Sequence, residues 1–157
     1  MSSYLERSIS LIGKETMNVI QNKTIMVVGL GGVGNWIALN LALSGQVSNL
    51  ILIDGDTIEN HNLNRTIFRF SDIGAYKVDA TMDIILERRA DCKVTVYREL
   101  TSPELLEKIS RQIIFDRSVY DHRALIMDCR DDIYDDLLDF NCKLYKIGYD
   151  GTSMKIS

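Results

Sequence analysis

The chain has 157 residues, a net charge of -4 and a pI of about 5.2, which suits one acidic domain of ordinary size. Hydrophobic residues make up 46% of it, enough for a sizeable core, so disorder is not expected. No basic stripe could neutralise many phosphates, so bulk nucleic-acid binding is not expected. No apolar run reaches membrane-spanning length, and we expect a soluble, cytoplasmic protein with no membrane partner.

The first half of the chain predicts an N-terminal helical arm, residues 1–22, followed by the start of a sheet. Thr24–Val28 is a short apolar run, which is typical of a buried parallel strand. Val33–Ser44 carries apolar residues around most of its circumference, so we expect a helix that is largely buried. Asn49–Asp54 is a second apolar run and predicts a second buried strand.

The second half continues the alternation of helices and strands. The predicted elements are a helix Ile73–Arg89, a strand Lys93–Tyr97, a helix Ser102–Ile113, a strand Ala124–Asp128, a helix Asp131–Phe140, and weaker strands Lys143–Ile147 and Met154–Ile156. This order predicts an α/β fold, a doubly wound and mainly parallel Rossmann-like sheet with N-terminal helices, in a single domain over residues 1–157. Ligands of such sheets bind at the carboxyl ends of the strands, where Gly29, Asp54 and Asp128 lie.

A glycine-rich turn follows the first predicted strand. Gly29 permits the tight turn, and Gly31 and Gly32 are expected to leave the backbone open to a phosphate. Gly34 allows the helix to pack closely on the strand. Asp54 lies 20 residues beyond Gly34, where a carboxylate accepts hydrogen bonds from ribose hydroxyls. The sequence therefore predicts a nucleotide site.

Two cations bear on which nucleotide binds. A polar cluster, NHNLNR at residues 60–65, ends in Arg65, and Lys77 follows 12 positions later. A polyphosphate needs such cations, whereas a hydride-transfer site does not. The glycine turn and Asp54 alone would suit NAD equally, so an NAD-binding oxidoreductase remains an alternative.

Four ordered motifs together resemble one family. The strings GLGGVG, LIDGDTIENHNLNR, DIGAYK and DCRD, which run from Gly29 to Asp131, resemble the ThiF/MoeB/HesA family of ubiquitin-activating-type adenylyltransferases. The GVGNW stretch, with LIGKE at residues 11–15, is most similar to the branch that contains the tRNA threonylcarbamoyladenosine dehydratases. In this family a carboxylate attacks the α-phosphate of ATP and an acyl-adenylate forms.

The resemblance implies specific roles. Asp54 would hold the ribose, Asp56 would belong to the same binding site, Asn62 and Arg65 would contact phosphates, Lys77 would lie over the α- and β-phosphates, Asp131 would hold Mg²⁺, and Arg7 would reach into the site of a partner subunit. The last role implies a homodimer. Three alternatives stay open: Arg65 in a surface salt bridge with Asp56 or Glu59, Lys77 on a solvated helix face, and Arg7 as an ordinary helix charge. His61, beside the cluster, could also contact the ligand.

The cysteines argue against zinc and covalent catalysis. Cys92, Cys129 and Cys142 are odd in number and widely spaced, so neither a zinc site nor a disulfide framework is expected. Cys129 follows an apolar run and Cys142 precedes one, so both are expected to be buried and unreactive.

The function expected is ATP-dependent adenylation of a carboxylate. The C-terminus of a ubiquitin-like or sulfur-carrier protein, or a small acyl or RNA carboxylate, could supply that group. The chain ends about where the family's substrate-binding half begins, so a non-catalytic ATP- or AMP-binding scaffold subunit is the main alternative.

Overall fold

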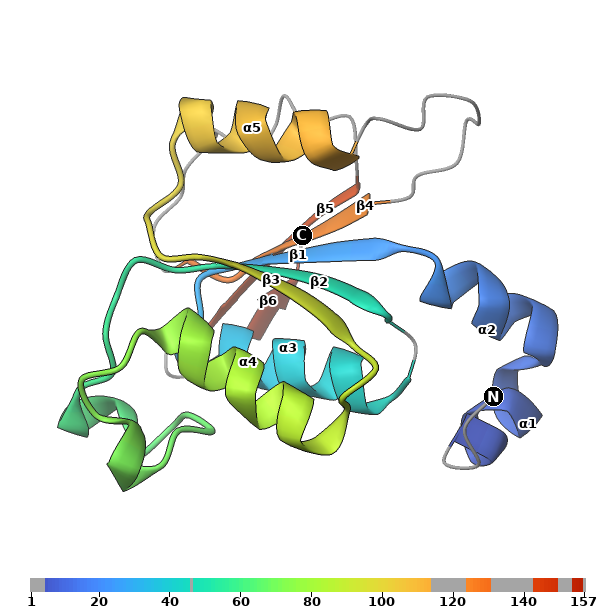
Figure 1. Cartoon of the computed structure of the whole chain (residues 1–157), viewed down its shortest axis with the longest axis horizontal. Coiled ribbons are helices and arrows are strands. Elements are labelled where there is room, and N and C mark those ends of the chain that lie inside the picture. Colours follow the sequence, from blue (N-terminus) through green and yellow to red (C-terminus); the bar gives the residue numbers. More distant parts are fainter. Residues whose placement is uncertain (1–4, 46, 114–123, 131–142, 150–153, 157) are drawn as a thin grey trace.

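A computed structural model describes residues 5–45, 47–113, 124–130, 143–149 and 154–156 (Figure 1). The helices are α1 (Glu6–Ile12), α2 (Lys14–Gln21), α3 (Gly34–Leu43), α4 (Lys77–Arg88) and α5 (Pro103–Ile113), and the strands are β1 (Thr24–Val28), β2 (Asn49–Ile53), β3 (Lys93–Tyr97), β4 (Ala124–Asp128), β5 (Lys143–Tyr149) and β6 (Met154–Ile156). Two 3-10 turns, η2 (Asn60–Asn62) and η3 (Phe70–Asp72), lie between β2 and α4. The helix expected over Asp131–Phe140 lies outside the described residues. Among the described helices, none is long and apolar enough to cross a membrane.

The described strands form one sheet in the order β3-β2-β1-β4-β5-β6. β1 lies between β2 and β4 and is parallel to both, while β6 pairs antiparallel with β5. The strand order reverses between β1 and β4, which is the switch point where a doubly wound sheet opens a crevice at its carboxyl ends. The expected α/β, mainly parallel Rossmann-like fold is confirmed.

Helices cover both faces of the sheet, with α3 and α4 on one side and α5 on the other (Figure 1). Neighbouring residues of β1 enter different cores: Val27 clusters with Ala38 of α3, and Val28 clusters with Ile109 of α5. A strand that is buried on both faces needs apolar side chains throughout, which explains why the sequence of β1 shows no alternation.

Helix α4 begins at Lys77, so the helix expected from Ile73 starts too early. Gly74 has a φ of +89°, and its N–H donates to Ile58 O at 2.9 Å. Tyr76, with φ -64° and ψ 138°, is extended rather than helical. The chain before Lys77 therefore pairs with the segment that follows β2 instead of continuing the helix.

Helix α3 is largely buried, as predicted, and its exposed residues are Trp36 and Asn40. Ala38, Leu39 and Ala42 are buried, but Trp36 is 47% exposed. Trp36 lies on the side of α3 that meets the loop before η3, where its indole N–H donates to Arg65 O at 3.1 Å. An aromatic side chain with a polar N–H suits such a half-exposed position.

The N-terminal helices α1 and α2 lie beyond the amino ends of the strands (Figure 1). Leu5 is buried beneath Gly45, where a Cβ would come within 1.8 Å of Leu5 Cδ2. Gln21 Nε2 donates to Gly45 O at 3.0 Å. The arm is thus fixed to the end of α3 that is far from the glycine turn.

Candidate functional site

The glycine turn joins β1 to α3 at the carboxyl edge of the sheet. Gly29 has a φ of +84°, a conformation that favours glycine. At Gly34 a Cβ would come within 1.8 Å of Gly29 O, so only glycine lets the helix start this close to the strand. Gly31 differs, because no described atom lies within 4 Å of the position of its Cβ. The turn therefore has a closed side at Gly34 and an open side at Gly31.

Asp54, directly after β2, is bonded to the glycine turn. Its Oδ2 accepts from Leu30 N at 2.6 Å and its Oδ1 from Asp56 N at 2.8 Å. Asp54 is 8% exposed, and this burial raises the pKa of its carboxyl group, although the two N–H bonds and Lys77 oppose the shift. The carboxylate thus lies beside the turn, as the spacing predicts, and its contact with a ribose stays a prediction.

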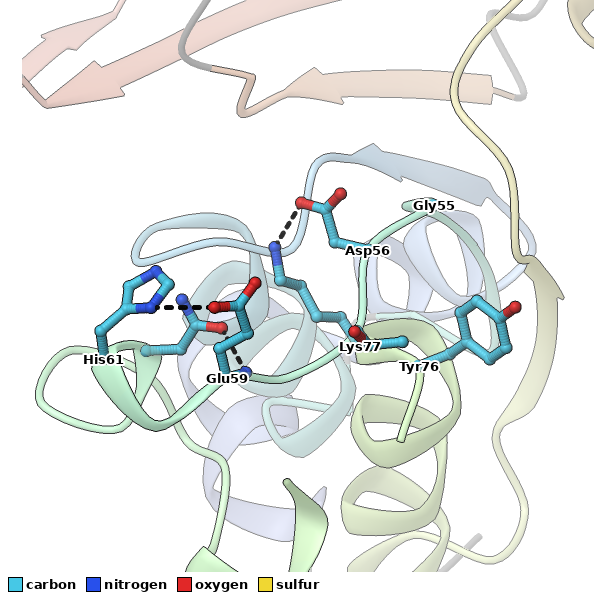
Figure 2. A pocket seen from close by; sticks show the side chains of 8 residues that line it. Gly55, Asp56, Glu59, His61, Tyr76 and Lys77 are labelled. Atoms are coloured by element: carbon cyan, nitrogen blue, oxygen red, sulfur yellow. Dashed lines mark hydrogen bonds and ion pairs between the residues drawn. The ribbon is translucent and has the colours of Figure 1, made fainter. Parts of the chain in front are cut away.

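Lys77 points back toward the aspartates that follow β2 (Figure 2). Its Nζ lies 2.7 Å from Asp56 Oδ2 and 4.0 Å from Asp54 Oδ1. The side chain of Lys77 is 10% exposed, so the solvated-face alternative is wrong. The side chain of Asp56 is 63% exposed, so solvent weakens its attraction for Lys77.

A pocket of about 390 Å³ opens beside this pair (Figure 2). It is lined by Gly55, Asp56, Thr57, Glu59, His61, Asn62, Tyr76 and Lys77. His61 Nδ1 lies 3.4 Å from Glu59 Oε2, and both side chains are exposed. The walls are polar and carry both signs of charge, since Lys77 is a cation and Asp56 and Glu59 are carboxylates.

Asn62 lines the same pocket but also holds its own segment. Its side chain is buried, and its Oδ1 accepts from Glu59 N at 2.9 Å, which caps η2. Within the described part of the chain its Nδ2 has no hydrogen-bond partner. A phosphate contact, as predicted, would therefore come from Nδ2, which is a donor.

Arg65 lies over the glycine turn. Its Cδ is 3.2 Å from the position of a Cβ on Gly32, so the stem of the arginine covers that glycine. The structure differs here from the expectation that Gly32 leaves the backbone open. Arg65 Nη1 donates to His61 O at 2.7 Å and to Asn64 Oδ1 at 3.1 Å. Arg65 forms no ion pair with a described residue, so the surface salt bridge with Asp56 or Glu59 is wrong.

The structure adds a residue that the sequence analysis missed. Asn35 is fully buried in the first turn of α3, and its Nδ2 donates to Leu30 O at 3.4 Å and to Gly31 O. Its Oδ1 accepts from Ile67 N at 3.2 Å. The stretch NWIALNLAL contains two amides, and only Asn35 is buried while Asn40 is exposed, so an amide in an apolar stretch was a partial signal.

Asp128 and Arg130 lie beside the glycine turn, at the carboxyl end of β4. Asp128 pairs with Val28 across β1 and β4, so it does reach the same edge as Gly29. Arg130 binds both of its oxygens, with Nε–Oδ1 at 2.8 Å and Nη2–Oδ2 at 3.0 Å. Arg130 Nη1 also donates to Thr101 Oγ1 at 2.6 Å. Asp131, the predicted magnesium ligand, lies outside the described residues.

The two described cysteines are poor nucleophiles. Cys129 is buried, as predicted, and burial raises the pKa of its thiol to about 12, which disfavours the nucleophilic thiolate. Burial also raises the pKa of the Cys92 thiol. Cys142 lies outside the described residues. Among the described side chains, no three His, Cys, Asp or Glu groups could together hold a metal ion.

Arg7 is not brought to the site within one chain. It is exposed on α1, at the amino ends of the strands, while the glycine turn lies at their carboxyl ends (Figure 1). A contact between Arg7 and a nucleotide would therefore need a second copy of the chain.

Several known proteins are similar to this chain in sequence and fold. The tRNA threonylcarbamoyladenosine dehydratase of Bacillus subtilis is 33% identical over 109 residues, which are 69% of this chain and 42% of that protein. The NEDD8-activating enzyme E1 catalytic subunit of Caenorhabditis elegans is 41% identical over 86 residues, which are 54% of this chain and 20% of that protein. The chain thus spans less than half the length of these two relatives.

A crystal structure of the E. coli tRNA N6-threonylcarbamoyladenosine dehydratase in complex with AMP has the same fold. It superposes with a TM-score of 0.78 at 23% identity and covers 91% of this chain and 58% of that one. The model of the ThiF family matches residues 5–147, nearly the whole chain. This protein belongs to the ThiF family.

Proposed function

We propose that this chain binds ATP at the glycine turn and joins its AMP moiety to a carboxylate. The observation that carries this proposal is the gathering of the glycine turn, Asp54, Arg65 and Lys77 at one edge of the sheet. An anion-binding turn, a carboxylate for a ribose and two cations match the parts of a nucleoside triphosphate.

The relatives support ATP as the nucleotide. The E. coli dehydratase has been solved in complex with AMP and in complex with ATP. A relative from Aspergillus niger, 36% identical over 113 residues, is named an adenylyltransferase and sulfurtransferase. NAD needs only the glycine turn and Asp54, so an NAD-binding oxidoreductase would give no role to Arg65 or Lys77.

The chemistry needs positive charge more than a protein nucleophile. A carboxylate oxygen of the substrate attacks the α-phosphorus, the bond to the bridging oxygen breaks, and pyrophosphate leaves with the electron pair. Negative charge grows on the phosphate oxygens, and Arg65 and Lys77 would neutralise it. Lys77 reaches a phosphate when its contact with the exposed Asp56 carboxylate is exchanged for one with the ligand.

We propose Asp131 as the protein ligand of Mg²⁺. Magnesium is usually held by one or two carboxylates together with substrate phosphates, so a single aspartate fits this donor set. Asp131 follows Arg130, which the pairing with Asp128 fixes at the carboxyl edge. The ion would offset phosphate charge in the bound complex.

Three further parts of the proposal concern partners and location. A homodimer would bring Arg7 of one copy to the site of the other. The carboxylate would come from the C-terminus of a ubiquitin-like or sulfur-carrier protein, or from a modified RNA. A cytoplasmic location would suit the free thiols of Cys92 and Cys129.

ATP–pyrophosphate exchange, with magnesium and a carrier protein ending in a free carboxylate, tests the proposal. We expect exchange in the wild-type protein and a loss on the order of a hundredfold in Arg65→Ala, because a cation is removed from the reacting phosphate. Arg69→Ala is the matched control, since Arg69 lies in the same loop but pairs with Glu87 on the surface. Exchange that Arg65→Ala leaves unchanged would contradict the proposal. ATP binding without exchange would favour the scaffold alternative, and NAD binding without ATP binding would favour the oxidoreductase.

A further inference from the structure

The segment that carries Arg65 is hydrogen-bonded to α3 at two backbone positions, one on Arg65 and one on Ile67. Trp36 Nε1 donates to Arg65 O at 3.1 Å, and Asn35 Oδ1 accepts from Ile67 N at 3.2 Å. The other hydrogen bonds of residues 65–67 among the described residues stay within their own turn, to residues 61–64. Asn35 and Trp36 therefore supply the hydrogen bonds that join this segment to α3, in addition to the packing of Ile67 and Phe68 on the core.

The same asparagine also holds the glycine turn. Its Nδ2 faces Leu30 O and Gly31 O, while its Oδ1 faces the loop, so one amide links the two segments. Only this orientation of the amide matches two acceptors on one side and a donor on the other. Since Asn35 is fully buried, the link is shielded from competing water.

Gly32 completes the arrangement, because its missing Cβ leaves room for the Arg65 stem at 3.2 Å. We infer that Asn35 and Trp36 are positioning residues for Arg65, an inference that rests on the proposed function. They hold the arginine over the turn that binds the nucleotide, so its guanidinium meets the phosphates without a further ordering of the loop. Fixing a charged group before the ligand arrives removes an entropic cost from binding.

A double-mutant cycle on ATP binding tests this inference. The variants are Trp36→Phe, Arg65→Ala and the combination of both, with ATP affinity measured by calorimetry. Trp36→Phe keeps an aromatic ring, smaller than the indole, and removes the N–H donor, so we expect ATP to bind on the order of three- to tenfold more weakly. In the Arg65→Ala background the same change should have no further effect, because there is no guanidinium left to position.

Asn40→Ala is the matched control for helix α3. Asn40 Nδ2 donates to Trp36 O at 2.8 Å on the exposed side of the helix, away from the glycine turn. We expect it to leave ATP affinity unchanged. Asn35→Ala should act like Trp36→Phe, and if it does not fold, the Trp36→Phe cycle alone decides.

Each other outcome overturns the inference. If Trp36→Phe weakens ATP binding equally in both backgrounds, the indole has a general structural role. If it has no effect in the wild-type background, it does not position Arg65. If the wild-type protein binds ATP and Arg65→Ala does not weaken it, the proposed function survives in part while this inference fails. If the wild-type protein binds no ATP, the proposed function fails first and the inference with it.

Discussion

Gly31 and Gly34 lie in the same turn, yet substitution by alanine should affect the stability of the protein very differently at the two positions. At Gly34 the new Cβ would come within 1.8 Å of Gly29 O, so α3 or β1 must move. We expect Gly34→Ala to lower the free energy of unfolding by about 3 kcal/mol or more, or to prevent folding. At Gly31 the Cβ would enter open space, and we expect a change within about 1 kcal/mol.

For ATP affinity, the substitution at Gly31 matters more than it does for stability. A methyl group on Gly31 would occupy the space that a phosphate needs, so we expect Gly31→Ala to weaken ATP binding at least tenfold, or by about 1.4 kcal/mol, in a stable protein. Urea unfolding and calorimetry measure the two quantities separately. A Gly31→Ala variant that binds ATP as the wild type does would show that the phosphates lie elsewhere.

At the level of single residues, the sequence could predict what depends on local spacing. The order of strand, glycines and Asp54 was enough to place that carboxylate beside the turn, because adjacent parallel strands end at the same edge. The roles of Gly32 and Asn35 depend on where residues 65–67 return, about thirty residues later, and no local pattern encodes that return.

The end of helix α4 supports the end of helix α3 through one buried arginine. Arg89 is 2% exposed, and its Nη1 donates to Ala42 O at 2.7 Å and to Val47 O at 3.0 Å. We expect Arg89→Met to cost about 2–4 kcal/mol in urea unfolding, because two carbonyls lose a charged donor. Arg88→Met is the control, since Arg88 is exposed at the end of the same helix and should change stability by less than about 0.5 kcal/mol. Equal effects of the two changes would contradict this role.

The ion pair between Arg89 and Asp91 makes the stability of the protein sensitive to pH. Hydrogen bonding to Arg89 lowers the pKa of Asp91 below 3.8, so the folded state favours the ionised carboxylate. This stabilisation is complete at pH values above the ordinary pKa of 3.8, and it is lost as the pH falls through the lower pKa of the folded state. The Asp91 side chain is 65% exposed, so we expect Asp91→Asn to cost less than about 1 kcal/mol near neutral pH. When unfolding is measured over a pH series, the difference in free energy of unfolding between the wild type and Asp91→Asn should disappear at the acid end. A difference that stays constant would contradict this role of Asp91.

The elements that the sequence predicted well are those buried on both faces. The runs predicted at Thr24–Val28 and Asn49–Asp54 match β1 and, to within one residue, β2, since a covered parallel strand needs apolar side chains throughout. The start of α4 was wrong because Gly74 and Tyr76 pair with the chain after β2, a tertiary contact that overrides helical periodicity. The exposure of Trp36 was missed for a similar reason, as its indole packs on a distant loop.

At the scale of the whole molecule, the site and Arg7 lie at opposite ends of the sheet (Figure 1). The alternation of strands and helices was sufficient to predict this topology, because right-handed crossovers leave few other arrangements. The hydrophobic periodicity of one chain does not show where Arg7 lies relative to a second copy. The family resemblance alone suggests that two copies share their sites.

Subunit mixing tests whether Arg7 acts in the site of a partner. Arg7→Ala and Arg65→Ala would each impair both sites of a homodimer, so we expect weak ATP–pyrophosphate exchange from either variant alone. In an equal mixture that has exchanged subunits, half of the dimers are mixed, and each mixed dimer has one site with both arginines intact. Exchange should therefore recover to about a quarter of the wild-type rate. Native mass spectrometry shows whether mixed dimers have formed, and mixed dimers that recover no activity would mean that Arg7 does not complete the site of the other copy.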